Sequence, residues 1–387
     1  MNQNFDHFRV DVSQNGIAPK VVIVVPGLGA GGSEHVVSLV ANHWLSRGFG
    51  VTILTLEPPG TKPYYELAPG ISVVRIGIPP RRTSNVEAAW LVLQRIHRMR
   101  RTIGAIKPDF ILSFLTRTNV LALLSTLGTG IPVIVSERNN PEAQPFGSGW
   151  KRLQEMLYPR AWGLVAMTTG AMEFFPQGMR RRSWVIPNAV DLPMGWEKRR
   201  GEKVVAAVGR LTHQKGFDIL LEAFAKIEAF FPDWRLVIWG EGDDRGKLEE
   251  RRRALGLEGR VEMPGVTAKP GQWVECADVF VLSSRYEGWG IVLLEAMAAG
   301  LPVVSFDCKW GPASMISHDE DGLLVPPEDP VALAEGLARL LSDEGLRARL
   351  SLRATETTKR YSKDRVLAQW DEVADSVLVR QRNEKAE

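Results

Sequence analysis

The stretch VVIVVPGLGAGGSEHVV, residues 21–37, decides the fold expected for this chain. Five apolar, mostly β-branched residues lead into a proline and four glycines, and a helix-like pattern follows. A buried strand, a glycine-rich turn and a helix in this order open a doubly wound α/β domain. Gly27, Gly29 and Gly32 also fit the G-x-G-x-x-G pattern of dinucleotide-binding proteins. This raises the question of which phosphate-containing ligand these glycines approach.

The same alternation of short apolar strands and amphipathic helices continues along the chain in two blocks. The first block predicts strands at 21–25, 51–56, 72–77, 110–114, 132–137, 163–168 and 184–188. The second block predicts strands at 204–209, 235–240, 261–265, 278–283, 302–306 and 322–326. Continuous apolar strands separated by helices are typical of parallel sheets that are covered on both faces.

A length of 387 residues also suits two cores better than one. We therefore expect an α/β protein of two facing Rossmann-like domains with a ligand cleft between them and helices at the C-terminus. The expected parts are an N-terminal domain at 1–190, a polar linker at 191–203, a C-terminal domain at 204–362, and a final helix at 363–387 that packs back on the N-terminal domain.

The composition is that of an ordinary globular protein, with 44% hydrophobic and 24% charged residues. No run of about 18 apolar residues occurs, so we expect no transmembrane helix. The polar N-terminus lacks the apolar core of a signal peptide. Cys276 and Cys308 do not form a C-x-x-C pair, which predicts neither disulfides nor a zinc site and favours the cytoplasm.

The net charge of +3 is unevenly distributed. Residues 1–195 contain 20 Lys and Arg against 12 Asp and Glu, a net charge of +8, which leaves −5 for the remainder. A basic first half favours an anionic partner such as a membrane surface or a nucleic acid. Chance variation of the surface is the alternative.

Two cations follow the first strand of the second block. Arg210 and Lys215 come directly after the strand at 204–209, and Gly216 then opens a helix. At such a turn an Arg fork and a Lys point charge can hold a diphosphate. The alternative is a pair of solvated surface charges.

Two carboxylates eight residues apart mark a second strand-to-helix turn. Glu287 precedes Gly288-Trp289-Gly290, and Glu295 lies about two turns into an otherwise apolar helix. Glycines at a helix start let backbone N–H groups approach an anion. A carboxylate on an apolar helix needs hydrogen-bond donors, such as ribose hydroxyls, although capping of a neighbouring backbone would also satisfy it.

These motifs together resemble the family 4 retaining glycosyltransferases, which have the two-domain GT-B fold. The resemblance rests on motifs that follow one another in order, VIPNAVD (185–191), VGRLTHQKGFDILLEAF (208–224), RLVIWGEGDDRGKLE (235–249), SSRYEGWGIVLLEAMAAGLPVVSFD (283–307) and DGLLVPPEDP (321–330). It implies that 1–190 binds the acceptor and that 204–362 binds a nucleotide-sugar.

The resemblance also implies roles for matching residues. Arg210, Lys215 and Glu287 become the catalytic candidates, since the two cations would stabilise the leaving diphosphate and Glu287 would face the transferred sugar. The expected donor-binding residues are Gly31, Gly32, Gly209, Glu241, Gly265, Gly288, Trp289, Gly290, Ile291 and Glu295. Glu295 would meet the ribose, and the loop after 261–265 would lie near the base.

Breaking a sugar–diphosphate bond develops negative charge that fixed cations and a helix N-terminus can stabilise. Asp243 and Asp244 are adjacent at a helix start and do not form the Asp-x-Asp motif of metal-dependent sugar transferases. We therefore expect no metal and no other cofactor. Retention can proceed by front-face attack of the acceptor hydroxyl, so no covalent nucleophile is assigned.

A closer resemblance is to bacterial N-acetylgalactosaminyl transferases that extend polyprenyl-diphosphate-linked glycans. It rests on SERNNP (136–141), SFDCKWGP (305–312) and GGSEHVVSLVANHW (31–44), and it implies UDP-GalNAc or a related UDP-sugar as donor. The chain departs from that pattern with Ala313 and Ser314 where a Glu usually follows Gly-Pro, and with SERN where many members have a sugar-contacting His. Arg117, Glu137 and Arg138 are expected on the acceptor side.

The basic half predicts how the enzyme would reach a lipid-linked acceptor. QRIHRMRR (94–101) places Arg95, Arg98, Arg100 and Arg101 on one helix behind an apolar turn, and Arg180, Arg181 and Arg182 form a second cluster. Such a surface can dock on the inner face of an anionic membrane, which gives a cytoplasmic, peripherally associated enzyme with no nucleic-acid partner. An ordinary solvated helix face is the alternative.

Three other functions remain open. A nicotinamide- or flavin-dependent oxidoreductase would use the opening glycines, with Glu57 after the second strand as the acidic residue, but it gives no role to the motifs of the second half. A nucleotide-sugar epimerase or glycan phosphorylase would keep the fold and change the reaction. A carbohydrate-binding homologue would keep the fold and lose catalysis.

Overall fold

The computed structural model describes residues 18–79, 84–143, 147–190 and 201–386, which form two compact units. The first unit comprises the chain up to Arg138, 145–186 and the chain from Val366 onward. The second unit comprises 139–144 and 187–365. Most of the expected linker, at 191–200, lies outside the described residues.

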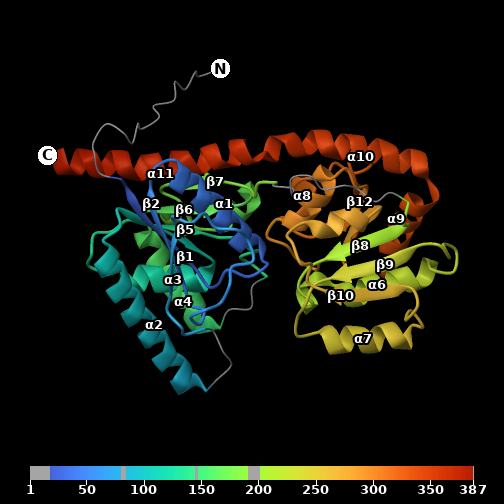
Figure 1. The fold of residues 1–387 in the computed structure, drawn as a ribbon, viewed down its shortest axis with the longest axis horizontal. Coiled ribbons are helices and arrows are strands. Elements are labelled where there is room, and N and C mark those ends of the chain that lie inside the picture. Colours follow the sequence, from blue (N-terminus) through green and yellow to red (C-terminus); the bar gives the residue numbers. More distant parts are fainter. Residues whose placement is uncertain (1–17, 80–83, 144–146, 191–200, 387) are drawn as a thin grey trace. The chain divides into compact units, whose positions relative to one another are not determined.

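The first unit is built on a parallel sheet with the strand order β3-β2-β1-β4-β5-β6-β7. Its strands are β1 Lys20–Val25, β2 Gly50–Thr55, β3 Ser72–Arg75, β4 Phe110–Phe114, β5 Val133–Ser136, β6 Gly163–Ala166 and β7 Ser183–Val185. Its helices are α1 Gly32–Ser46, α2 Asn85–Ile106, α3 Thr116–Ser125, α4 Ser148–Leu157, α5 Thr169–Glu173 and, from Val366 on, α11 Lys363–Ala386. In Figure 1 the helices flank the strands, as a sheet buried on both faces requires.

The second unit repeats this plan with the parallel order β10-β9-β8-β11-β12-β13. Its strands are β8 Val204–Val208, β9 Arg235–Trp239, β10 Val261–Gly265, β11 Val279–Leu282, β12 Val303–Phe306 and β13 Leu323–Val325. Its helices are α6 Phe217–Ile227, α7 Arg245–Ala254, α8 Ile291–Ala298, α9 Pro330–Ser342 and α10 Glu344–Thr358. The expected fold class of two Rossmann-like α/β units is confirmed.

The core of the second unit shows why the strands read as continuous apolar runs. Alternate residues of β8, Val205 and Ala207, join a buried cluster with side chains of α6 and α9, including Leu220, Phe224 and Leu337. The other strand residues face the opposite layer, so the strand interiors are buried on both sides. In such sheets, ligands bind at the loops that follow the carboxyl ends of the strands.

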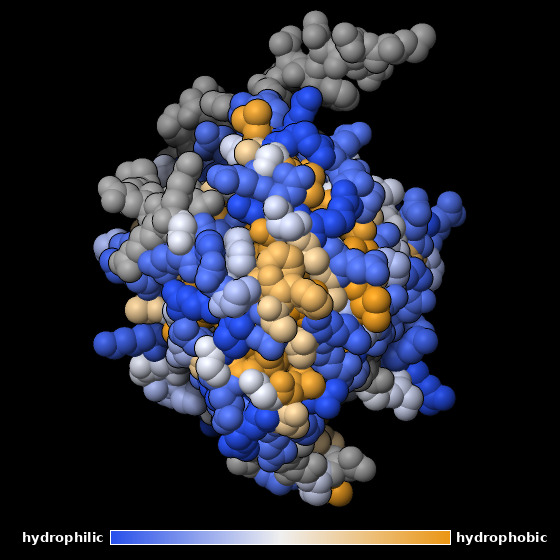
Figure 2. Space-filling model, turned by 90° about the vertical axis from the view of Figure 1, so that its right-hand side faces the viewer, coloured by the Kyte–Doolittle hydropathy of each residue, from blue (hydrophilic) through white to orange (hydrophobic). Residues whose placement is uncertain are grey.

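One face of the molecule illustrates how polar and apolar side chains are distributed on the surface. Figure 2 shows a face that is largely hydrophilic, with hydrophobic residues gathered near its middle. Large apolar side chains that stand exposed on the second unit include Phe230, Val331 and Leu352. Within the described part of the chain, no helix combines the length and the apolar character needed to cross a bilayer.

Candidate functional site

Lys215 is fixed at the carboxyl edge of the second sheet. It ends a short 3-10 turn, His213–Lys215, that separates β8 from α6. Its aliphatic chain lies over Gly209, where an added Cβ would stand 3.0 Å from the lysine side chain. The glycine after β8 therefore makes room for the lysine, which directs the ammonium group toward the loop after β11.

The ammonium group of Lys215 meets the carboxylate of Glu287. Lys215 Nζ lies 2.5 Å from Glu287 Oε1, and Ser284 Oγ donates to the same oxygen at 2.6 Å. The two charged side chains are only 13% and 7% exposed. Because an ion pair in a poorly solvated place needs good geometry to persist, this pair holds both groups in one orientation. The structure thus brings together two of the three residues expected to be catalytic.

Backbone contacts join the two loops that carry this pair. Ser283 Oγ donates to the Lys215 carbonyl at 2.9 Å, and the Arg285 N–H donates to the Gln214 carbonyl at 2.8 Å. Gly216 has φ +61°, and a Cβ there would lie 2.1 Å from the Ser283 carbonyl oxygen. Only glycine permits this close approach, so Gly216 sets the spacing of the loops.

The side chain of Arg285 also connects the loop after β11 to the start of α6. Its guanidinium donates to both carboxylate oxygens of Asp218 in the first turn of α6, at 2.8 and 2.6 Å, and to the His213 carbonyl at 2.8 Å. Partial burial raises the pKa of Asp218, but the bonds from Arg285 outweigh it and leave that pKa below its usual value. A bidentate arginine of this kind gives geometric precision.

The turn after Glu287 presents a helix N-terminus. Gly290 caps α8 with φ +89°, and no side chain caps the first turn of the helix. Trp289 is 2% exposed, and its ring packs edge-on against Tyr361 with centroids 4.9 Å apart. The buried tryptophan anchors the turn, so the N–H groups from Gly290 onward are held at the helix end, where an anion binds favourably.

The remaining expected donor residues of the second unit fall at strand ends or on α8. Arg210 is exposed just after β8, and Glu295 is half-buried on α8. Glu241 follows β9 and pairs with Arg245 at 2.6 Å, which lowers the pKa of this carboxyl group. Gly265 ends β10 with φ +95° beside the Glu241 side chain. Arg210 and Glu241 thus follow strands and Gly265 ends one, all at the carboxyl ends of the parallel strands, whereas Glu295 lies on α8.

Two groups that the sequence did not indicate lie against Glu287. A Cβ on Gly311 would lie 2.9 Å from Glu287 Cβ and 3.8 Å from Cys308 Sγ. Burial, followed by the nearby Glu287 charge, raises the pKa of the Cys308 thiol to about 12. The Cys308 thiol is therefore uncharged at neutral pH and lies beside Glu287 as a neutral group. Cys308 and Arg285 were missed because the groups they contact, Glu287 and Asp218, are distant in sequence, whereas Ser284 lies only three residues before Glu287.

In the first unit, the opening glycines form the turn into α1. Gly31 is the N-cap of the helix with extended backbone, and Gly32 is its first residue. Glu34 folds back over Gly31, since a Cβ on Gly31 would lie 2.2 Å from the Glu34 carboxylate. Glu57 Oε1 accepts a hydrogen bond from the Leu28 N–H at 3.0 Å. The acidic residue that a dinucleotide enzyme would use for ribose is thus engaged in holding the glycine turn.

Comparison with known families assigns both halves. Residues 30–193 match the model described as Glycosyltransferase Family 4, and residues 193–357 match the model described as Glycosyl transferases group 1. The two matches adjoin and span both units. The chain belongs to the family 4 glycosyltransferases and has the GT-B fold.

Two bacterial relatives illustrate the similarity of this glycosyltransferase to curated proteins. It is 31% identical over 288 residues to an exopolysaccharide phosphotransferase of Streptomyces coelicolor, a match that covers 73% of the chain but 30% of that longer protein. It is 27% identical to the N-acetylgalactosamine-N,N'-diacetylbacillosaminyl-diphospho-undecaprenol 4-alpha-N-acetylgalactosaminyltransferase of Campylobacter jejuni, over 90% of the chain and 97% of that protein.

Solved structures share the fold of the glycosyltransferase at low identity. Sucrose-phosphate synthase from Thermosynechococcus elongatus superimposes with a TM-score of 0.82 at 18% identity, over 93% of this chain and 99% of the other. HepE of Anabaena, solved in complex with UDP and glucose, superimposes with a TM-score of 0.76 at 20% identity, over 92% and 100%.

The structure corrects the expected acceptor role of Glu137. This carboxylate of the glycosyltransferase is 2% exposed and accepts hydrogen bonds from Thr116, Asn119 and Tyr158 within the first unit. Burial raises the pKa of Glu137, although the three donors act in the opposite direction. A carboxyl group enclosed by its own donors belongs to a buried polar network next to β5 and has no free face for an acceptor.

Arg138 is likewise placed inside the first unit rather than on the acceptor side. Its guanidinium donates to the Ile186 carbonyl at 2.8 Å and lies 5.1 Å from the Trp370 ring centroid and 5.7 Å from that of Phe114. Burial lowers the pKa of Arg138 to about 9. Of the three expected acceptor residues, Arg117 alone is exposed, with its guanidinium 5.8 Å from the Trp150 ring centroid.

The basic helix α2 differs from the expectation as well. Arg95 is buried and donates to the Ile78 carbonyl at 3.0 Å, so it does not belong to a basic surface. Arg98 and Arg100 remain exposed but donate to main-chain carbonyls. The exposed face of α2 instead begins with Val86, Trp90 and Leu93, spaced four and three residues apart.

No group of three or more His, Cys, Asp or Glu side chains in the described residues has the arrangement of a metal site. The expected catalytic groups of the second unit are Arg210, Lys215 and Glu287, and the N-terminus of α8 follows Glu287 in the chain. These groups combine positive charge for an anion with a fixed carboxylate that can accept a hydrogen bond.

Proposed function

We propose that the enzyme transfers a hexose or N-acetylhexosamine from a UDP-sugar to a glycan acceptor with retention of configuration. UDP-GalNAc is the best candidate donor, and a polyprenyl-diphosphate-linked glycan is the candidate acceptor, in the assembly of bacterial surface polysaccharides or glycoprotein glycans. The observation that carries this proposal is the Lys215–Glu287 ion pair at 2.5 Å. The two residues lie on strand-end loops that are hydrogen-bonded to each other.

The donor diphosphate would bind at the carboxyl edge of the second sheet. Arg210 and Lys215 supply two positive charges there, and the start of α8 at Gly290, which no side chain caps, supplies backbone N–H groups. Negative charge grows on the diphosphate as the sugar bond breaks, so preorganised donors stabilise the transition state more than the ground state.

Glu287 would position the sugar rather than attack it. Lys215 and Ser284 both bind Oε1, which leaves Oε2 available to accept a hydrogen bond from a sugar hydroxyl. We assign no covalent intermediate, and retention follows from attack of the acceptor hydroxyl on the face from which the diphosphate leaves. The two cations take the place that a metal has in other sugar transferases, so we propose a reaction that needs neither a metal nor another cofactor.

The relatives support the choice of substrates. The Campylobacter relative is named as an N-acetylgalactosaminyltransferase acting on a diphospho-undecaprenol glycan, and the fold neighbour HepE was solved with UDP and glucose. Because the identities are 27% and 20%, these names define candidates for a donor panel.

A lipid-linked acceptor would require peripheral attachment to the inner face of the membrane. We propose that α2 provides this contact through exposed Val86, Trp90 and Leu93, together with the exposed arginines of the basic N-terminal half. Apolar side chains enter the headgroup region while basic ones attract anionic lipids.

The decisive experiment incubates the enzyme with a panel of UDP-hexoses and UDP-N-acetylhexosamines, with and without EDTA, and a short polyprenyl-diphosphate glycan. Mass spectrometry of the lipid product and NMR of the new anomeric centre are the readouts. We expect one donor to extend the acceptor with retained configuration and EDTA to have no effect. Inversion, EDTA sensitivity or release of a free epimerised sugar would overturn the corresponding part of the proposal.

A further inference from the structure

The first unit has a pocket at the edge of its sheet opposite the glycine turn. The pocket has a volume of about 650 Å³ and is lined by residues that precede β5, β6 and β7, such as Ile131, Trp162 and Arg182. In a parallel sheet these are the amino ends of the strands, whereas Gly31 and Gly32 follow the carboxyl end of β1. The pocket is thus separate from the strand ends where the donor and acceptor groups were sought.

The charge of this pocket is one-sided. Its lining includes Arg160, Arg181, Arg182 and Arg380 and contains no Asp or Glu among its 18 residues. Within the described part of the chain, no carboxylate pairs with Arg160, Arg181 or Arg182. Four clustered guanidinium groups repel one another, so an anion that binds among them gains from each.

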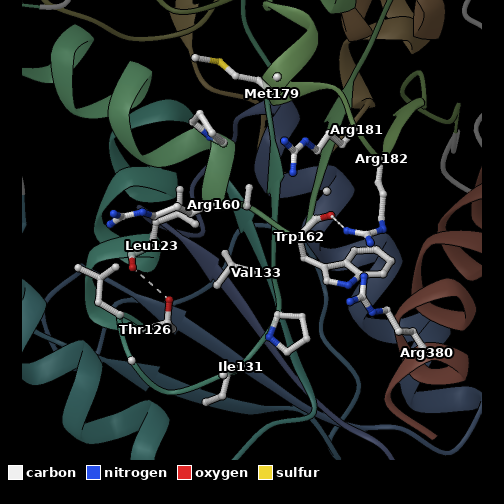
Figure 3. A pocket seen from close by; sticks show the side chains of 18 residues that line it. Leu123, Thr126, Ile131, Val133, Arg160, Trp162, Met179, Arg181, Arg182 and Arg380 are labelled. Atoms are coloured by element: carbon white, nitrogen blue, oxygen red, sulfur yellow. Dashed lines mark hydrogen bonds between the residues drawn. The ribbon is translucent and has the colours of Figure 1, made fainter. Parts of the chain in front are cut away.

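Figure 3 shows how the arginines surround the pocket. Arg181 and Arg182 come from the segment before β7, Arg160 lies across the pocket from them, and Arg380 reaches in from α11. Arg182 donates to the Trp162 carbonyl at 3.3 Å, and its guanidinium lies 4.9 Å from the Trp162 ring centroid. Arg182 is therefore partly held in place before any ligand arrives.

The floor of the pocket is apolar. Ile131, Val133 and Trp162 line it, and the Trp162 ring stacks on Trp184 with centroids 5.9 Å apart. Trp184 in turn packs so closely over Gly163 that a Cβ there would lie 2.6 Å away. A rigid apolar floor under a ring of arginines suits a phosphate group that bears a less polar substituent.

We propose that this pocket is a binding site for a phosphate ester, distinct from the donor site. The arginine forks bind the phosphate oxygens, and the apolar floor receives the ester substituent. The phosphate can belong to a soluble ester or to the headgroup of a membrane lipid, which share the same recognition chemistry.

The test measures binding of inorganic pyrophosphate by calorimetry in the presence of saturating UDP, which fills the donor site. Wild type is compared with Arg181→Glu and Arg160→Glu, and with Arg253→Glu as a control that changes the net charge equally at an exposed arginine of α7. We expect at least about tenfold weaker binding in the two pocket variants and no change in the control. Thermal denaturation and the milder Arg181→Ala variant exclude loss of folding as the cause.

A second arm measures co-sedimentation of the same variants with vesicles of phosphatidylcholine, with and without phosphatidylglycerol. Loss of vesicle binding in the pocket variants assigns the site to a lipid headgroup, and loss of pyrophosphate binding with unchanged vesicle binding assigns it to a soluble ester. Equal behaviour of the pocket variants and Arg253→Glu in both arms would overturn the proposal.

Discussion

At the scale of single residues, Lys215 is the most informative position. Its ammonium group lies 2.5 Å from Glu287 and is 13% exposed, so Lys215→Ala removes a fixed charge from the proposed diphosphate site and leaves Glu287 without its cation. We expect sugar transfer to fall by about 100-fold or more. Initial rates with the preferred UDP-sugar measure this loss.

Arg210→Ala tests the second cation without disturbing an ion pair. Arg210 is exposed, so its removal should reduce transfer while leaving the melting temperature within about 2 °C of wild type. Lys247→Ala, at an ammonium group that is 81% exposed on α7, is the matched control and should retain full transfer. Normal rates in both Lys215→Ala and Arg210→Ala would contradict the assignment.

The residues that the sequence predicted correctly as neighbours share a simple property. Lys215 and Glu287 each follow a strand of one parallel sheet, and the carboxyl ends of such strands meet at one edge. The misassigned Glu137 also follows a strand, but its environment is set by Asn119 and Tyr158, which lie 18 and 21 residues away. Side-chain burial of that kind depends on tertiary packing, so the residue type alone could not predict it.

At the scale of structural elements, the junction between η4, residues His213–Lys215, and α6 depends on Gly216. Its φ of +61° and the 2.1 Å distance from an added Cβ to the Ser283 carbonyl oxygen predict that Gly216→Ala separates the two loops. We expect a loss of about 1–3 kcal/mol in the free energy of unfolding and weaker UDP binding.

The control is Gly246→Ala in α7, where a Cβ meets open space. Its free energy of unfolding should instead increase by about 0.5–1 kcal/mol. Chemical denaturation and UDP titration of both variants provide the comparison, and unchanged UDP affinity in Gly216→Ala would contradict this account.

The clamp between Arg285 and α6 predicts a pH dependence. Burial acts to raise the pKa of Asp218, but Arg285 lowers it more, so the folded pKa lies below the unfolded one. A depressed carboxyl pKa stabilises the fold above the unfolded value of about 3.9, and this contribution disappears as the pH falls through the folded value. Asp218→Asn should therefore cost up to about 1 kcal/mol near neutral pH, and this cost should shrink as the pH falls below the unfolded value of about 3.9.

Denaturation curves of wild type and Asp218→Asn at neutral and at acid pH measure the difference in the free energy of unfolding. The control is Asp233→Asn, which removes a surface pair with Lys203. A difference between wild type and Asp218→Asn that persists unchanged at acid pH would show that the substitution acts through packing rather than through the charge.

At the scale of the whole molecule, the alternation of strands and helices predicted two parallel sheets, and the strand order confirms both. What the pattern could not supply is that a short internal segment leaves the first unit. Residues 139–144 belong to the second unit although both of their flanks belong to the first. The contact between Arg138 and Trp370 joins two parts of the first unit, and their separation of more than two hundred residues hides it from any local pattern.

The C-terminal segment makes the folding of the first unit depend on the end of the chain. Trp370 of α11 is fully buried, 5.9 Å from the Phe114 ring centroid, and the neighbouring Asp371 pairs with Arg47 at 2.6 Å. Trp370→Ala should therefore destabilise the first unit by about 3–5 kcal/mol.

The second unit has its own buried core, so its unfolding transition and its UDP affinity should remain near wild type. Calorimetry should show one transition shifted to lower temperature and the other raised by added UDP, since a ligand stabilises only the unit that binds it. A single transition that shifts as a whole in Trp370→Ala would mean that the two units unfold together, and that α11 stabilises both.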